Sequence, residues 1–122
     1  MMPFERLQAW KACDDLAVAV YKATETFPRH ELYALTSQLR RAAFSSAANI
    51  AEGSAKRGPR EFRRFLDISI GSLSEIAYGL HIAKRLGYLT LEKWRAMDRL
   101  RSYASKLTWH LYKSLKSSTV AL

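Results

Sequence analysis

The stretch that decides the fold runs Leu32-Tyr-Ala-Leu-Thr-Ser-Gln-Leu-Arg-Arg-Ala-Ala-Phe-Ser-Ser-Ala-Ala-Asn-Ile-Ala-Glu-Gly53. Apolar and small residues recur in it at spacings of three and four, and no β-type alternation is present. The recurring positions are Leu32, Leu35, Leu39, Ala42, Ser46 and Asn49. This period places one side of an α-helix against a core. The sequence therefore predicts a long helix over residues 31–52.

Three further segments have the same period, over residues 5–26, 59–86 and 91–116. Strong breaks separate them at Phe27-Pro28, at Gly53 with Gly58-Pro59, and at Gly87. Short connections force neighbouring helices to be antiparallel. We therefore predict one all-α domain over residues 1–122, an antiparallel up-down-up-down four-helix bundle.

Residues at the predicted helix ends agree with this division. Pro59 suits the first position of a helix, and Thr90 suits an N-cap. Gly53 and Gly87 are predicted to end their helices in the left-handed conformation.

The helix over residues 31–52 carries a second apolar stripe on its opposite side. Its members are Tyr33, Ser37, Arg40, Phe44, Ala47 and Ala51. A helix that is apolar on two sides is buried on two sides. We expect Tyr33, Arg40, Phe44, Ala47 and Ala51 to form an interface between copies of the chain. The alternative is a set of ordinary surface apolar groups.

Composition favours a soluble, cytoplasmic protein with polyanionic partners. The net charge is +9, and residues 88–122 hold seven basic residues against two acidic ones. The longest run without a charge, residues 42–51, is too short to span a membrane. Cys13 is the single cysteine and no secretory signal is visible, so we expect a reducing compartment.

One face of the last predicted helix is uniformly basic. We call it the α-terminal stripe; its members are Arg95, Arg99, Ser102, Lys106, Trp109, Lys113 and Lys116. A solvated face normally mixes both signs of charge, whereas this one has no acidic residue. Trp109 among lysines is typical of a platform on which an unpaired base stacks. The alternatives are plain solvation and a tryptophan at a subunit contact.

A second basic group surrounds the link between the second and third helices. We call it the second-loop cluster; it comprises Lys56, Arg57, Arg60, Arg63 and Arg64, tempered by Glu61. We expect Arg57, Arg60, Arg63 and Arg64 to assist the α-terminal stripe in binding phosphates.

Catalytic and metal-binding patterns are missing from the sequence. His30, His81 and His110 form no Glu-x-x-His pair of the kind that di-iron bundles need. Cys13 lies on an apolar seam, where a free cysteine is usually a small hydrophobic residue. No glycine-rich phosphate loop is present. We expect no enzyme activity, no metal and no cofactor.

The segment Gln38–Gly53 resembles the signature of a bacterial family, the four-helix-bundle proteins encoded in intervening sequences of 23S ribosomal RNA genes. Further matches are Phe27-Pro28 with Glu31 and Leu35, the block Gly71-Ser-Leu-Ser-Glu75, and Leu86-Gly-Tyr-Leu89. Many relatives carry a proline where this chain has Ala47 and Ala48. The resemblance implies a pentameric ring. It also implies a link to nucleic acid, since the related accessory protein of diversity-generating retroelements is basic and works beside a reverse transcriptase.

The motif residues Asn49, Glu52, Gly53 and Gly71 are predicted to serve architecture rather than chemistry. Asn49 falls on the core seam, where a lone polar residue selects register or oligomeric state. Glu52 is a candidate partner for an arginine such as Arg41. Gly71 with Ser72 suggests a close helix crossing.

The leading functional hypothesis is a non-enzymatic, oligomeric bundle that binds RNA or DNA largely independently of sequence, because no element for reading base edges is visible. The alternative is a structural or adaptor ring that docks a protein partner, such as a reverse transcriptase or a ribosome-associated factor.

Overall fold

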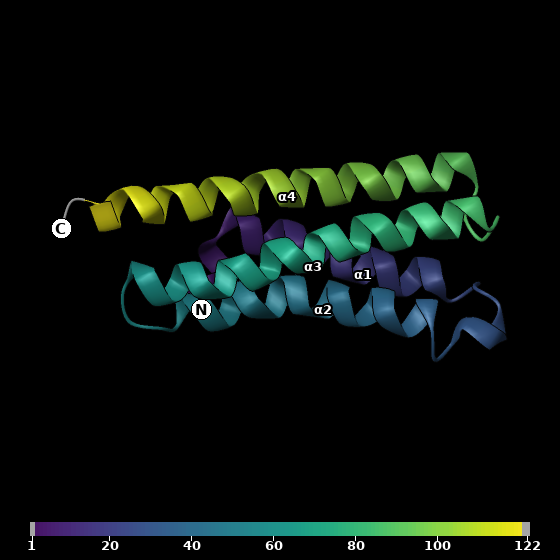
Figure 1. Cartoon of the computed structure of the whole chain (residues 1–122), viewed down its shortest axis with the longest axis horizontal. Coiled ribbons are helices and arrows are strands. Elements are labelled where there is room, and N and C mark those ends of the chain that lie inside the picture. Colours follow the sequence, from purple (N-terminus) through teal and green to yellow (C-terminus); the bar gives the residue numbers. More distant parts are fainter. Residues whose placement is uncertain (1, 121–122) are drawn as a thin grey trace.

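The chain folds into four long helices (Figure 1). The computed structural model describes the backbone of residues 2–120 and the side chains of residues 2–115. The helices are α1 (Gln8–Thr24), α2 (Leu35–Ser54), α3 (Pro59–Arg85) and α4 (Leu91–Val120), with short 3-10 turns η1 (Pro3–Arg6) and η2 (Arg29–Glu31). Residues 2–120 contain no strand. The all-α prediction is confirmed.

Each long helix packs against two of the others. Helix α2 contacts α1 and α3, and α4 also contacts α1 and α3. Figure 1 shows the four rods side by side, with the C-terminal end of α4 reaching past the α2–α3 connection. The largest fully buried side chains include Leu16, Leu39, Ile50, Leu66, Leu73, Ile76 and Leu80, so all of α1, α2 and α3 supply core residues. Ala104 and Thr108 are their fully buried counterparts on α4.

The turn between α3 and α4 has the predicted end signals. Gly87 has a φ of 78°, and its N–H donates to the carbonyl of Lys84 at 3.0 Å. The N–H of Tyr88 donates to the carbonyl of Ala83 at 2.8 Å, which completes a Schellman motif. Thr90 Oγ1 then accepts the N–H of Lys93 at 3.1 Å and caps α4. The predictions for Gly87 and Thr90 are confirmed.

The first two helices begin later than predicted. Leu7 is extended, with a φ of −86° and a ψ of 124°, so α1 starts at Gln8 and η1 folds back as a separate turn. This bend brings the rings of Phe4 and Trp10 edge to face, 4.8 Å apart. Helix α2 starts at Leu35, whose N–H donates to the carboxylate of Glu31 at 3.3 Å.

Gly53 does not end its helix in the left-handed conformation, so that prediction is wrong. It lies inside α2 with a negative φ and is buried. A Cβ there would lie 2.8 Å from Cβ of Phe65 and 2.9 Å from Cδ1 of Phe62. Glycine is required because α3 approaches closely, not because the backbone turns.

Gly71 does not mark a close helix crossing, so that prediction is wrong too. It is exposed, and a Cβ there would meet nothing within 4 Å. A second close approach of α2 and α3, besides the one at Gly53, lies at Gly79, eight residues after Gly71. A Cβ at Gly79 would lie 2.5 Å from Cδ2 of Leu39.

Asn49 lies beside the core rather than in it, and this corrects the predicted seam. It is half-buried, and its Nδ2 donates to the carbonyl and to Oγ of Ser45, both at 2.9 Å. Ser72 Oγ on α3 donates in turn to Ser45 Oγ at 2.8 Å. Asn49 thereby joins a hydrogen-bond chain that links α2 to α3. Glu52 is exposed and forms no ion pair with Arg41 within residues 2–115.

A layer of small polar residues crosses the centre of the bundle. Cys13, Ser46, Ser69 and Thr108 come from α1, α2, α3 and α4 in turn, and all are fully buried. Ser69 Oγ donates to the carbonyl of Ser46 at 2.6 Å, and Cys13 Sγ lies 3.7 Å from Thr108 Oγ1. Burial raises the pKa of the Cys13 thiol. The prediction that Cys13 is a core residue is confirmed.

Two motif blocks distant in sequence meet at one end of the bundle. The ring of Phe27 lies 5.5 Å from the ring of Tyr88. The Tyr88 hydroxyl donates to Glu31 Oε2 at 2.8 Å, and this hydrogen bond raises the pKa of Tyr88. The contact ties the α1–α2 connection to the α3–α4 turn, so Phe27, Glu31 and Tyr88 have an architectural role.

Candidate nucleic-acid interface

The basic residues of the α-terminal stripe lie on the outer side of α4. Arg95, Arg99, Lys106 and Lys113 are all exposed, whereas Met97, Ala104 and Thr108 on the opposite side are buried. The helical period therefore separates the two sides as the sequence predicts. Lys116 belongs to the predicted stripe but lies outside the residues whose side chains are described.

Most of the stripe's cations have no carboxylate beside them. The ion pairs within residues 2–115 are His30–Glu31, Arg64–Glu61 and Arg101–Asp98. In the last of these, Asp98 borders the stripe, and its carboxylate is neutralised by Arg101, which donates to it at 2.7 Å. Arg95, Arg99 and Lys106 are left without an acidic partner in this part of the chain. Such unneutralised charges attract phosphates.

The second-loop cluster is built by the sharp link from α2 to α3. Gly58 has a φ of 83°, so the chain reverses there and Pro59 starts α3. Arg60 and Arg57 are exposed. Arg64 pairs with Glu61 at 3.3 Å, and its guanidinium lies 4.7 Å from the ring centre of Phe65. One carboxylate therefore neutralises only part of the cluster.

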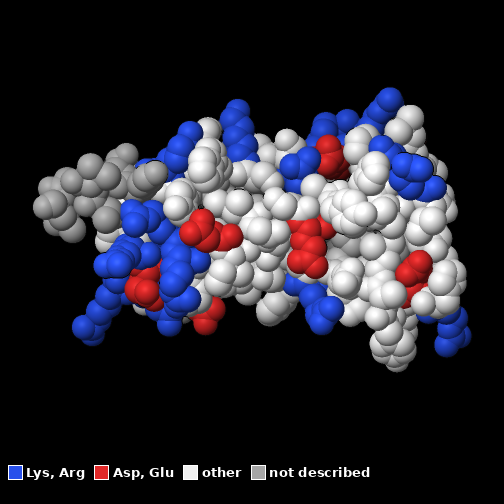
Figure 2. All heavy atoms as spheres, in the orientation of Figure 1, with Lys and Arg blue, Asp and Glu red and all other residues white. Residues whose placement is uncertain are grey.

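At one end of the bundle the second-loop cluster lies next to Tyr112 of α4. Three arginines and two carboxylates of α3 and one tyrosine of α4 line a hollow of about 380 Å³; they are Arg60, Glu61, Arg63, Arg64, Asp67 and Tyr112. Figure 2 shows Lys and Arg gathered at the end where Figure 1 places the α2–α3 connection, and further along the edge formed by α4. Tyr112 links the two groups, because it lines this hollow and its ring stacks on Trp109 of the stripe.

An aromatic pair stands beside this hollow. Trp109 is 47% exposed, and the ring of Tyr112 stacks on it with centres 5.4 Å apart and planes 7° from parallel. The Lys113 ammonium lies 5.8 Å from the ring centre of Trp109. Sequence analysis identified Trp109 but missed Tyr112. The only available signal was the spacing of three residues, which places the two rings on neighbouring turns of a helix.

The residues predicted to form an oligomer interface differ in their exposure, and Tyr33 lies in the turn before α2 rather than on the helix as predicted. Tyr33 and Phe44 project into solvent, 92% and 65% exposed. Arg40 instead contacts α1 of its own chain, where its Nε donates to Thr24 Oγ1 at 2.8 Å. Ala47 and Ala51 are half-buried. The outer strip of α2 is therefore narrower than predicted, because α1 covers one edge of it.

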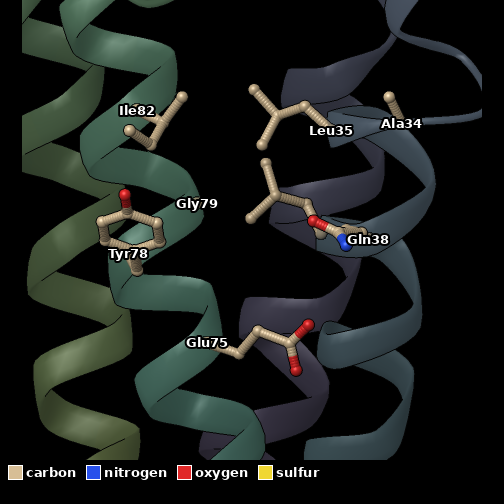
Figure 3. A pocket seen from close by; sticks show the side chains of 8 residues that line it. Ala34, Leu35, Gln38, Glu75, Tyr78, Gly79 and Ile82 are labelled. Carbon is tan, nitrogen blue, oxygen red and sulfur yellow. The ribbon is translucent and has the colours of Figure 1, made fainter.

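A second hollow opens between α2 and α3. It has a volume of about 250 Å³, and its lining comprises Ala34, Leu35, Gln38, Leu39, Glu75, Tyr78, Gly79 and Ile82. Figure 3 shows Leu35 and Ile82 facing each other across it, with Glu75 at one end. Leu39 packs closely on Gly79 within this lining, so a side chain at Gly79 would displace Leu39. Nothing within residues 2–115 occupies this apolar depression.

Among the described residues, no group of three or more His, Cys, Asp and Glu side chains is arranged to hold a metal ion. Nor does any helix in this part of the chain have the length and apolar character needed to cross a bilayer.

Comparison with known proteins identifies a family and a fold. Residues 5–110 match the family model described as 23S rRNA-intervening sequence protein. A similar solved structure is that of a protein of unknown function from the S23 ribosomal protein family of Bacteroides thetaiotaomicron VPI-5482. It has a TM-score of 0.77 and 22% identity, over 86% of this chain and 98% of that one. Among curated proteins, none matches the chain.

Proposed function

The chain belongs to the family of 23S rRNA-intervening sequence proteins, and we propose that it is a non-enzymatic, self-associating bundle that binds RNA or DNA. Binding is to the sugar–phosphate backbone, because exposed cations along the outer side of a long helix suit a row of phosphates. Recognition is therefore largely independent of base sequence.

The observation that carries this proposal is the row of exposed cations on α4, together with the arginines of the second-loop cluster at one end of the bundle. Arg95, Arg99 and Lys106 lack acidic partners within residues 2–115, and Arg60 lines a hollow that also includes Tyr112 of α4. A merely solvating surface would alternate its charges to avoid repulsion. Repulsion among these cations is relieved when phosphates replace their counterions.

The wild-type protein is expected to bind labelled RNA and DNA with an affinity that falls steeply with salt. The slope of log affinity against log salt should be about −0.7 to −0.9 for each phosphate engaged. Fluorescence anisotropy titrations at several salt concentrations measure this slope. A protein that fails to bind either nucleic acid at low salt would refute the proposal and favour the adaptor that docks a protein partner.

Self-association is the second part of the proposal. It is supported by two apolar features, the exposed rings of Phe44 on α2 and of Tyr33 in the turn before α2, and the hollow between α2 and α3. A closed ring needs two different surfaces on each copy, one of which meets the other on the next copy. The exposed aromatic rings of one copy would fit the apolar depression of the next copy.

We infer that an up-down-up-down bundle assembles into a ring of about five copies, the number that the family resemblance implies. The ring would place several basic regions on one particle. Their combined field would strengthen binding to a long polyanion, because several sites can engage one strand.

Phe44→Glu is expected to dissociate the assembly while leaving the helices intact. Phe44 is 65% exposed in the single chain, so a charge there costs little unless another copy covers it. Light scattering should show a mass several times 13.9 kDa for the wild type and close to 13.9 kDa for the variant.

Tyr103→Glu is a suitable control, because Tyr103 is a similarly exposed aromatic residue on α4. It should leave the mass unchanged. A wild-type protein that is monomeric at tens of micromolar would contradict self-association. Loss of helical circular dichroism in Phe44→Glu would instead place Phe44 in the core of the monomer.

A further inference from the structure

We propose that Trp109, Tyr112, Lys113 and Arg60 form a site for an unpaired nucleotide of a single strand, in which the base stacks on Trp109. Phosphates next to that base would lie against Lys113 and Arg60. This inference rests on the proposed function and adds a preference for single strands to it. Backbone binding alone does not distinguish single strands from duplexes.

The aromatic pair is preorganised for stacking. Tyr112 packs on Trp109 with ring planes 7° from parallel, so the indole is supported before any ligand arrives. Trp109 is nevertheless 47% exposed, which leaves much of its surface available. A large apolar ring that stays in water has a favourable contact to gain from a base. A supported ring loses little conformational freedom when a base stacks on it.

Cations of both α4 and α3 lie near the aromatic pair. The ammonium of Lys113 lies 5.8 Å from the indole centre, and Tyr112 shares the 380 Å³ hollow with Arg60, Arg63 and Arg64. Glu61 in that hollow is already engaged by Arg64 at 3.3 Å. Asp67 adds one more negative charge, but the three arginines outnumber the two carboxylates. The hollow is thus suited to a phosphate next to a stacked base.

The arrangement favours a single strand for a geometric reason. In a duplex each base is stacked between its neighbours and offers no open face to a side chain. An unpaired base has such a face, and every base type offers one, so the preference is for strandedness and not for sequence.

Trp109→Ala tests the site when its effect on single strands is compared with its effect on a duplex. We expect the affinity for a labelled single strand to fall about tenfold or more, and the affinity for the matching duplex to change less than about twofold. Trp109→Phe should retain most of the single-strand affinity, because it keeps an aromatic ring. Tyr103→Ala is the matched control, since Tyr103 is a 56% exposed aromatic residue on the same helix but outside the proposed nucleotide site. It should change neither affinity.

A second measurement reports the contact directly. With Trp10 and Trp94 replaced by phenylalanine, Trp109 is the remaining tryptophan of the three. Its fluorescence should be quenched by the single strand and not by the duplex. Equal loss of both affinities in Trp109→Ala, or no loss with no quenching, would overturn the site while leaving backbone binding in place. Failure of the wild type to bind either form would instead remove the proposed function itself.

Discussion

Replacing Arg99, Lys106 and Lys113 together with glutamate is expected to lower nucleic-acid affinity by about a hundredfold or more at low salt. All three side chains are exposed on the outer side of α4, so the bundle should keep its helicity and thermal stability. Circular dichroism checks the fold, and anisotropy titration checks the affinity.

The size of this effect follows from counterion release. Each cation that neutralises a phosphate adds about 0.7 to 0.9 to the slope of log affinity against log salt. Losing three such contacts should therefore flatten the slope by about two to three. The glutamates also repel the backbone they face, so the loss should exceed that of three alanine substitutions.

A matched control separates the position of the charges from their number. Lys11, Lys22 and Arg29 are also exposed, but they lie on α1 and the connection after it. Glutamate at these three positions takes the net charge from +9 to +3, as in the stripe variant. The control should retain most of the affinity. An equal loss in both variants would mean that net charge alone governs binding and that the stripe is not the site.

Ile76→Ala is expected to destabilise the fold by about 2–5 kcal/mol. Ile76 is fully buried on the core side of α3. Truncation loses the transfer free energy of the removed methylene and methyl groups, and it leaves a cavity that a packed bundle closes only in part. Urea unfolding followed by circular dichroism measures the change as a shift of the midpoint at constant slope.

Ile68→Ala is the control for this prediction, because it makes the same change on the same helix at a side chain that is 44% exposed. Its cost should be less than about 1 kcal/mol. Similar costs at the two positions would contradict the placement of the core, since they would mean that both faces of α3 are equally buried.

The helices were predictable from sequence because each of them is defined by interactions between residues three and four apart. The ends of α3 illustrate this: Pro59 and Gly87 impose their backbone geometry locally, whatever packs around them. The starts of α1 and α2 were less predictable. The extended conformation of Leu7 is linked to the packing of Phe4 on Trp10, and the spacing of apolar residues does not reveal such a bend.

The roles of the motif glycines required the tertiary structure. The prediction for Gly53 was wrong because a glycine near a helix end suggests a turn, whereas this one makes room for Phe62 and Phe65 of another helix. Gly71 and Gly79 occur in similar helical surroundings in the sequence, yet only Gly79 contacts a neighbouring helix closely, at Leu39. The distance between helices depends on the packing of every side chain between them, and no local pattern contains it.

The candidate site, like the fold, was predictable from the sequence only in part. The sequence by itself determined that the cations of α4 share one exposed face, because a period of 3.6 residues sets the direction of each side chain along a helix. Only the tertiary structure decided that Tyr112 supports Trp109 and that Arg60 and Tyr112 line the same hollow. Arg60 and Tyr112 are far apart in the chain. They meet because the core aligns the first turns of α3 with the last turns of α4, and that alignment follows from burying side chains of all four helices at once.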